Sequence, residues 1–115
     1  MTASASRRRR GRDTERAVSD YLRANGWPHA KPVGAGSPGA DVTGTPGLAF
    51  EVKARAGFEP AEWLRQAAGR VGLPVVVLRL NGQGIADPAV YFAGLRLGDL
   101  VTVLGAAGYG DGGAR

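Results

Sequence analysis

Residues 39–55 read GADVTGTPGLAFEVKAR and place three charged residues around one short apolar segment. Strand alternation over residues 48–55 predicts an apolar face toward the core and an opposite, charged face that carries Glu51 and Lys53. The GTPG sequence predicts a turn back to a strand over residues 40–43. The stretch therefore predicts a β-hairpin with Asp41 on its first strand and Glu51 and Lys53 on its second.

The geometry of the turn decides whether the two acids lie on one face. A plain two-residue turn flanked by Gly44 and Gly47 would place Asp41 and Glu51 on opposite sides. A one-residue bulge or an odd-length loop would align them, and the glycines make such a bulge easy. Both geometries are compatible with the sequence.

The segments around the hairpin predict an α/β protein, a mixed β-sheet flanked by helices. A helix over residues 14–25, N-capped by Asp13 or Thr14, precedes the hairpin. Periodicity and breaker residues predict further elements: an edge strand near 28–33, a helix over 60–71, a buried strand over 75–80, a short strand over 89–93 and a small helix over 97–104. The order is α-β-β-β-α-β with a β-α appendage at the C-terminus.

Helical spacing also predicts which side chains of the last two helices are apolar and inward-facing. For residues 60–71 these are Leu64, Ala67, Ala68 and Val71. For residues 97–104 they are Leu97, Leu100, Val101 and Leu104. Either stripe is compatible with ordinary core or with a dimer interface.

The net charge of +5 on 115 residues is concentrated at the N-terminus. Five arginines, at positions 7, 8, 9, 10 and 12, precede the first acid, and the remaining ten bases balance ten acids. We expect a disordered basic arm over residues 1–12, one domain over 13–104 and a flexible tail over 105–115. Such an arm predicts binding to a polyanion such as nucleic acid. The alternative is an arginine run that only aids solubility.

Several classes of site are excluded by composition. The chain has no cysteine and one histidine, so disulfides, thiolate catalysis and Cys or His-rich metal sites are excluded. No stretch approaches the roughly 20 apolar residues of a membrane span, and the N-terminus lacks the apolar core of a secretory signal. These features fit a cytoplasmic location without a membrane partner.

The acids themselves predict a metal site. Asp41 and Glu51 offer hard oxygen ligands of the kind that Mg²⁺ or Mn²⁺ prefers, and Glu15 from the first helix would complete the set. Such a site activates water and neutralises charge on a phosphoryl group, while Lys53 orients the water or holds the phosphate. The alternative is an exposed strand face with a simple Glu–Lys pair and a solvent-facing Glu15.

Three stretches, RGRDTERAVSDYLRANGW, GAGSPGADV and FEVKAR, resemble the archaeal-type Holliday junction resolvases of the PD-(D/E)-x-K nuclease superfamily, which also occur in phage-like relatives. The resemblance runs from about Arg10 to Leu80. It implies a restriction-endonuclease-like fold, a homodimer, a divalent metal and paired nicks at four-way DNA junctions, in the nucleoid or in a phage-infected cell.

The resemblance also implies roles for individual residues. The catalytic set is Glu15, Ser37, Asp41, Glu51 and Lys53, in which the metal ligands are Glu15, Asp41 and Glu51. Together with the charge pattern, it predicts DNA-binding residues at Arg7, Arg8, Arg9, Arg10, Arg12, Arg16, Lys31 and Arg55. Two alternatives stay open: another nuclease of this superfamily acting on branched, nicked or damaged DNA, and a non-catalytic DNA-binding protein.

Overall fold

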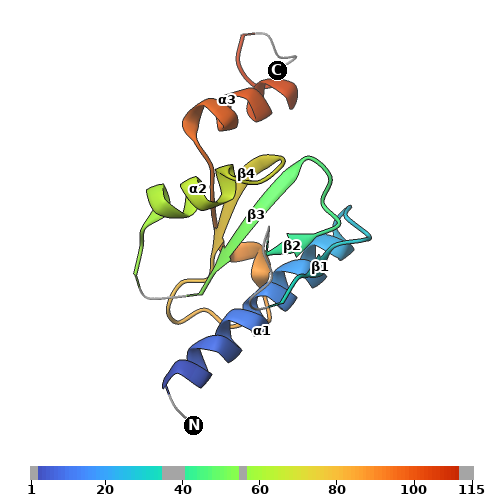
Figure 1. Ribbon diagram of the computed structural model, residues 1–115. Helices are drawn as coiled ribbons and strands as arrows, with labels where there is room; N and C mark the ends of the chain where they lie inside the picture. Colours follow the sequence, from blue (N-terminus) through green and yellow to red (C-terminus); the bar gives the residue numbers. More distant parts are fainter. Residues whose placement is uncertain (1–2, 35–40, 55–56, 112–115) are drawn as a thin grey trace.

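A computed structural model describes residues 3–34, 41–54 and 57–111 of the chain. It confirms an α/β protein in which helices cover a mixed sheet (Figure 1). The elements in order are α1 (Ala3–Ala24), β1 (Lys31–Pro32), β2 (Val42–Thr43), β3 (Leu48–Lys53), α2 (Pro60–Ala68), β4 (Leu73–Leu78), the 3₁₀ turn η1 (Pro88–Val90), β5 (Phe92–Gly94) and α3 (Leu97–Ala106).

The main sheet has the strand order β3-β4-β5. β3 and β4 run parallel, from Leu48 opposite Leu73 to Lys53 opposite Leu78, and α2 connects them. β5 pairs antiparallel with β4. The predicted buried strand is therefore central, although it begins and ends two residues earlier than residues 75–80. β1 and β2 form a separate antiparallel pair.

Helices pack on both faces of the main sheet, because alternate strand residues contact different helices. Val18 and Leu22 of α1 belong to one core cluster with Phe50, Val52 and Val77. On the other face, Trp63 of α2 packs against Val76 and Leu78. The side of β3 that carries Ala49 and Glu51 is also buried, so the alternative of an exposed strand face is wrong.

The N-terminal segment is part of α1 from Ala3 onward, which differs from the expected disordered arm over residues 1–12. Alanine and arginine are strong helix formers, so the run can continue the helix. Arg10 also fastens it to the body, because its Nε and Nη2 donate to the carbonyls of Ala54 and Leu80, both at 3.3 Å.

The expected N-cap at Asp13 or Thr14 is wrong, because both residues lie inside α1. Thr14 is fully buried, and its hydroxyl donates to the carbonyl of Arg10 at 2.7 Å. The same hydroxyl accepts a hydrogen bond from Arg79 at 3.1 Å. Thr14 therefore ties the middle of α1 to the end of β4 and does not begin a helix.

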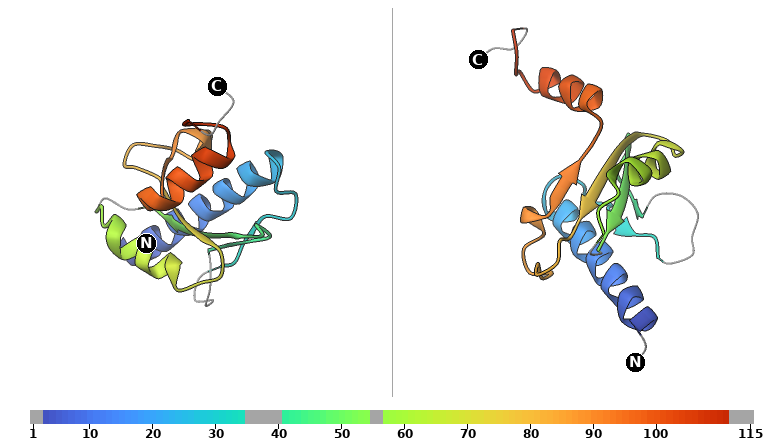
Figure 2. Two further views of the ribbon diagram at one scale, coloured as in Figure 1. Left: turned by 90° about the horizontal axis from the view of Figure 1, so that it is seen from above. Right: turned by 90° about the vertical axis from the view of Figure 1, so that its left-hand side faces the viewer.

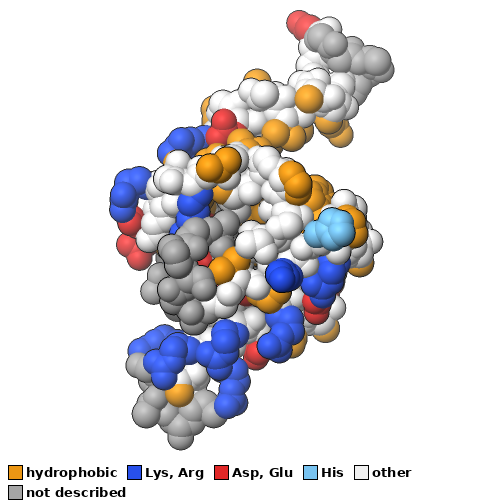
Figure 3. Space-filling view, turned by 45° about the vertical axis from the view of Figure 1, so that its right-hand side comes forward, with side chains coloured by type: hydrophobic (Ala, Val, Ile, Leu, Met, Phe, Trp, Pro, Cys, Tyr) orange, Lys and Arg blue, Asp and Glu red, His pale blue; other side chains and the backbone are white. Residues whose placement is uncertain are grey.

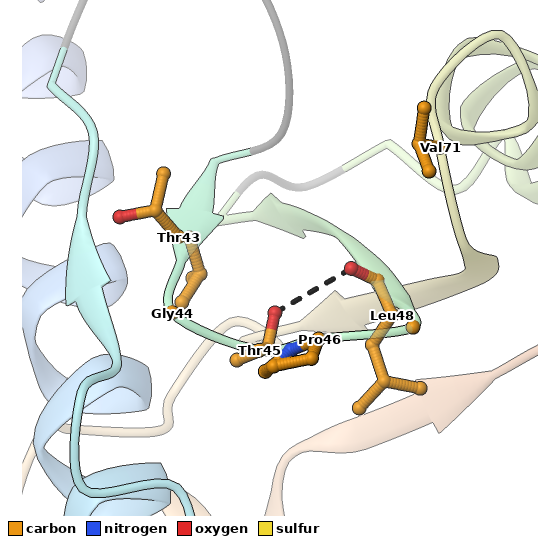
Figure 4. A pocket seen from close by; sticks show the side chains of 8 residues that line it. Thr43, Gly44, Thr45, Pro46, Leu48 and Val71 are labelled. Atoms are coloured by element: carbon orange, nitrogen blue, oxygen red, sulfur yellow. Dashed lines mark hydrogen bonds between the residues drawn. The ribbon is translucent and has the colours of Figure 1, made fainter.

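The turn between β2 and β3 depends on Gly44. Its φ is +78°, and a Cβ at this position would lie 2.0 Å from the carbonyl oxygen of His29. Only glycine fits such a conformation and approach. Figure 4 shows the pocket of about 370 Å³ beside this turn, which is lined by small and apolar groups and carries no titratable side chain.

The predicted helix over residues 60–71 ends earlier, at Ala68, where Gly69 follows as the C-cap. Ala67 is buried as predicted, and Leu64 is partly buried. The inward positions of Ala68 and Val71 are wrong, because Ala68 is exposed and Val71 is 97% exposed. Trp63 fills the core in their place.

The C-terminal elements differ from the predicted ones in their bounds, and the last of them, α3, stands apart from the sheet. The segment predicted as a strand over 89–93 is divided between η1 and β5. The predicted small helix is present as α3, and it continues to Ala106, into the expected tail. α3 projects clear of the sheet in the right-hand view of Figure 2, and Leu97 is 74% exposed and Val101 60% exposed. No helix in the described ranges is long and apolar enough to cross a membrane.

Candidate metal and DNA site

Asp41 joins the β1–β2 pair to the main sheet. Its N–H donates to the carbonyl of Phe50 at 3.1 Å, and its Oδ2 accepts the N–H of Val52 at 2.8 Å. The carboxylate thus takes the place of a backbone acceptor beside β3, while β2 itself pairs with β1. The regular hairpin is therefore replaced by an irregular junction, which holds Asp41 directly against the strand that carries Glu51.

Glu51 and Lys53 lie on the same side of β3, as strand alternation predicts. The Glu51 side chain is only 6% exposed, and Lys53 Nζ lies 3.0 Å from its Oε2. Lys53 also lies over the Trp63 ring, 5.9 Å from the ring centroid. α2 supplies that ring and covers this side of the strand, so the pair is largely removed from water.

Glu15 reaches the same region from α1. Its pKa is raised from 4.5 to about 7, first by burial and then by the negative charges of Asp41 and Glu51, against the opposing effect of Lys53. A charge must be near another to shift its pKa in this way. Glu15 on α1 is therefore near enough to the residues of β3 and to Asp41 for their charges to act on its carboxyl.

Asp41 is subject to the same electrostatic repulsion. Burial raises its pKa, and the charge of Glu51 adds to that increase. The hydrogen bond from Val52 and the positive charges of Arg70 and Lys53 oppose it. Three carboxylates thus share a partly buried region with two cations, and additional positive charge there would relieve their repulsion.

The donor chemistry of this acid cluster (Glu15, Asp41 and Glu51) fits Mg²⁺ or Mn²⁺, because carboxylate oxygens are the ligands these ions prefer. Across residues 3–34, 41–54 and 57–111, however, no three His, Asp or Glu side chains converge closely enough to hold an ion between them. Both oxygens of Glu51 instead lie against cations of the chain itself, Lys53 and Arg70.

Basic residues of α1 lie beside the acid cluster. Arg12 and Arg16 line a pocket of about 140 Å³ together with Glu15 and the backbone around Val33. Figure 3 shows lysine and arginine side chains gathered over the end of the molecule where α1 begins. Arg8 and Arg9 are exposed there. These residues form a basic extension of α1 that leads toward Glu15.

Two of the predicted DNA-binding residues lie elsewhere or have another role. Arg10 is turned toward the body, where it hydrogen-bonds the ends of β3 and β4. Lys31 lies exposed on β1 and lines a different pocket, with Arg23 and His29. The predicted site residues Ser37 and Arg55 lie outside the described residues.

Arg70 is a member of the cluster that sequence reasoning missed. It follows the C-cap of α2 and forms an ion pair with Glu51 Oε1. Its position in the sequence did not indicate this role, because an arginine near the end of a helix commonly faces solvent or compensates the helix dipole. Its proximity to Glu51 depends on how α2 packs against β3.

Comparison of the chain with protein-family models, with curated proteins and with solved structures finds no match.

Proposed function

We propose that this protein is a divalent-metal-dependent, structure-selective DNA endonuclease, with four-way junctions as its substrate. The observation that carries the proposal is the placement of Asp41 against β3, held by the N–H of Val52, beside the buried pair of Glu51 and Lys53. Three carboxylates and a lysine brought together at one strand suit metal-assisted phosphodiester hydrolysis.

Each residue of the site would have a separate role in cleavage. Glu15, Asp41 and Glu51 would hold the ion, and Lys53 would orient a water or a phosphate oxygen from its place beside Glu51. When bound, a divalent ion supplies Lewis-acid polarisation of the phosphoryl group and a more acidic water. The Val52 N–H fixes one oxygen of Asp41, so the other oxygen is the one left for a ligand.

The finer parts of the proposal rest on the sequence resemblance. These are the restriction-endonuclease-like arrangement of the sheet, the preference for Holliday junctions and the homodimer that would make two opposed nicks. The parallel β3 and β4 with α2 between them are compatible with that arrangement. The basic extension of α1 supports DNA as the substrate, because exposed arginines bind phosphates independently of sequence.

One observation favours a second candidate, a non-catalytic DNA-binding protein. Both oxygens of Glu51 already have cationic partners, Lys53 and Arg70. A buried carboxylate that is fully paired can serve structure alone. In that case the basic surface would bind DNA and the acid cluster would only hold β3, α1 and α2 together.

A cleavage assay separates these functions. The purified protein is incubated with a four-way junction, a linear duplex and a single strand of matched sequence, each with Mg²⁺, Mn²⁺ or EDTA. We expect metal-dependent cutting of the junction, and we expect Asp41→Asn and Glu51→Gln to slow it about a hundredfold or more, as for loss of a group that stabilises charge. Glu62→Gln, on the exposed part of α2, is the matched control and should cut normally.

Binding measured in Ca²⁺ separates loss of chemistry from loss of DNA contact. We expect both cluster variants to bind the junction as well as the unaltered protein, because removing a negative charge does not weaken contacts to phosphate. If all three DNAs were cut equally, the proposed selectivity for junctions would be wrong, and the proposed nuclease activity would stand. Absence of metal-dependent cutting, with junction binding retained, would support the non-catalytic alternative.

A further inference from the structure

Arg70 is placed at the acid cluster by the end of α2. The helix stops at Ala68, and the N–H of Arg70 donates to the carbonyl of Ala67 at 3.1 Å, which closes the last turn. The side chain then extends to Glu51 and is 25% exposed. Its positive charge also lowers the pKa of Asp41, against the effect of burial.

Glu51 is shared between two cations that are held in different ways. Lys53 lies two residues along the same strand and is covered by the Trp63 ring, so its position follows from β3 itself. Arg70 lies past the end of a helix and reaches Glu51 through its long side chain. Of the two partners of Glu51, Arg70 is the more exposed, at 25% against 18% for Lys53, and it has no place in the strand.

We propose that Arg70 is an internal counter-ion that occupies, on Glu51, the position a divalent cation takes when it binds. The inference rests on the proposed metal site. A buried carboxylate needs a compensating charge, and Arg70 supplies one in the absence of metal. Metal binding must therefore break the ion pair between Arg70 and Glu51, which lowers the metal affinity of the free protein. Arg70 is a positioning residue in this scheme, because it acts through Glu51.

The test is a titration of the full-length protein with Mn²⁺ in the absence of DNA, followed by the EPR signal of free Mn²⁺. Arg70→Gln removes the competing charge, so we expect Mn²⁺ to bind about tenfold or more tightly than to the unaltered protein, as for release of one charged hydrogen bond. Arg65→Gln is the matched control. Arg65 belongs to α2 and pairs with exposed Glu62, with Nε 3.0 Å from Oε1, so its loss should leave Mn²⁺ affinity unchanged.

Thermal unfolding provides a second readout. Without metal, Arg70→Gln should unfold at a lower temperature, because Glu51 keeps only Lys53 as a partner. Mn²⁺ should raise the unfolding temperature of this variant by more than that of the unaltered protein. If the ion pair between Arg70 and Glu51 had only a structural role, Arg70→Gln would show the same drop in unfolding temperature in EDTA but no gain in metal affinity.

The outcomes distinguish this inference from the proposed function. If neither the unaltered protein nor Arg70→Gln binds Mn²⁺, the metal site itself is wrong. If both bind it equally, the metal site stands and the role of Arg70 is refuted. Should Arg70→Gln not fold, Arg70→Met also removes the charge and keeps an unbranched side chain. We expect that variant to bind Mn²⁺ about tenfold more tightly, and unchanged affinity would contradict the inference.

Discussion

The carboxyl of Glu15 lies where its negative charge is unfavourable, since burial, Asp41 and Glu51 all raise its pKa, to about 7. In the unfolded chain the group has its ordinary pKa of 4.5. Between these values the folded protein keeps a proton that the unfolded chain releases. Glu15 therefore makes the metal-free protein less stable as the pH rises from about 4.5 through 7, and the loss is complete above 7.

Glu15→Gln should remove this loss of stability. In EDTA we expect the variant to unfold at a higher temperature than the unaltered protein at pH 8, with the advantage shrinking steadily toward pH 5. The measurement is thermal unfolding by circular dichroism at four pH values. Glu62→Gln should behave oppositely, because hydrogen bonding and charge from Arg65 lower the pKa of Glu62. An advantage of Glu15→Gln that does not depend on pH would contradict the raised pKa.

At the scale of elements, the two halves of α1 differ in their surroundings. Its C-terminal half packs Val18 and Leu22 into the core. Its N-terminal half extends past the sheet with exposed arginines (Figure 1). A rigid basic helix loses less conformational entropy on binding DNA than a disordered arm does. The helical form therefore increases the share of these arginines that can contact phosphate at once.

We predict different effects for arginines that face solvent and the one that faces the body. The triple variant Arg8→Gln, Arg9→Gln, Arg12→Gln should bind junction and duplex more weakly, and the slope of log affinity against log salt should fall by roughly 2 to 3. Its unfolding temperature should change little. Arg10→Gln should lower the unfolding temperature, because it loses the bonds to Ala54 and Leu80, and should change the salt slope least.

Fluorescence anisotropy over a salt series, with thermal unfolding of the same samples, checks both halves of this prediction. An unchanged slope in the triple variant would show that the extension does not contact DNA. A salt slope that falls as much in Arg10→Gln as in the triple variant would show that the hydrogen bonds of Arg10 do not persist in solution.

At the scale of the whole molecule, α3 is a ten-residue helix that contributes no buried residue to the core. Its stripe of Leu97, Val101 and Leu104 is 74%, 60% and 38% exposed, respectively, and Asp99 is the only charged residue of the helix. An apolar, nearly uncharged surface does not suit DNA. Two opposed nicks at a junction would require a second active site, which a symmetric dimer supplies. We therefore expect α3 to lie at a contact between two copies of the chain.

Sedimentation at micromolar concentration tests this expectation. The unaltered protein should have the mass of a dimer, and Val101→Asp with Leu104→Asp should halve it, since two buried charges oppose association. Val71→Asp, at a residue 97% exposed on the body, is the control and should leave the dimer intact. A monomeric unaltered protein, with and without junction DNA, would refute the dimer and weaken the proposal of a resolvase.

Local patterns in the sequence were sufficient for most elements and for the neighbouring positions of Glu51 and Lys53. Strand alternation placed Glu51 and Lys53 on one side of β3, and the run of apolar residues placed β4 in the centre of the sheet. Helical spacing also indicated α2 and α3, though not their ends or their buried sides. These features depend on neighbours within a few residues, so periodicity reveals them.

Contacts between distant segments determined the remaining features. The Asp41 carboxylate bonds Val52 in an irregular junction, and α2 buries the face of β3 that alternation alone suggests is open. Arg70 meets Glu51 across 19 positions of sequence. Arg10 meets Leu80 across 70. Such pairings leave no periodic pattern in the sequence, because they depend on how the helices pack on the sheet. The residue types thus indicated a metal and phosphate chemistry, while the fold determined which charges share the site and how Glu51 is paired.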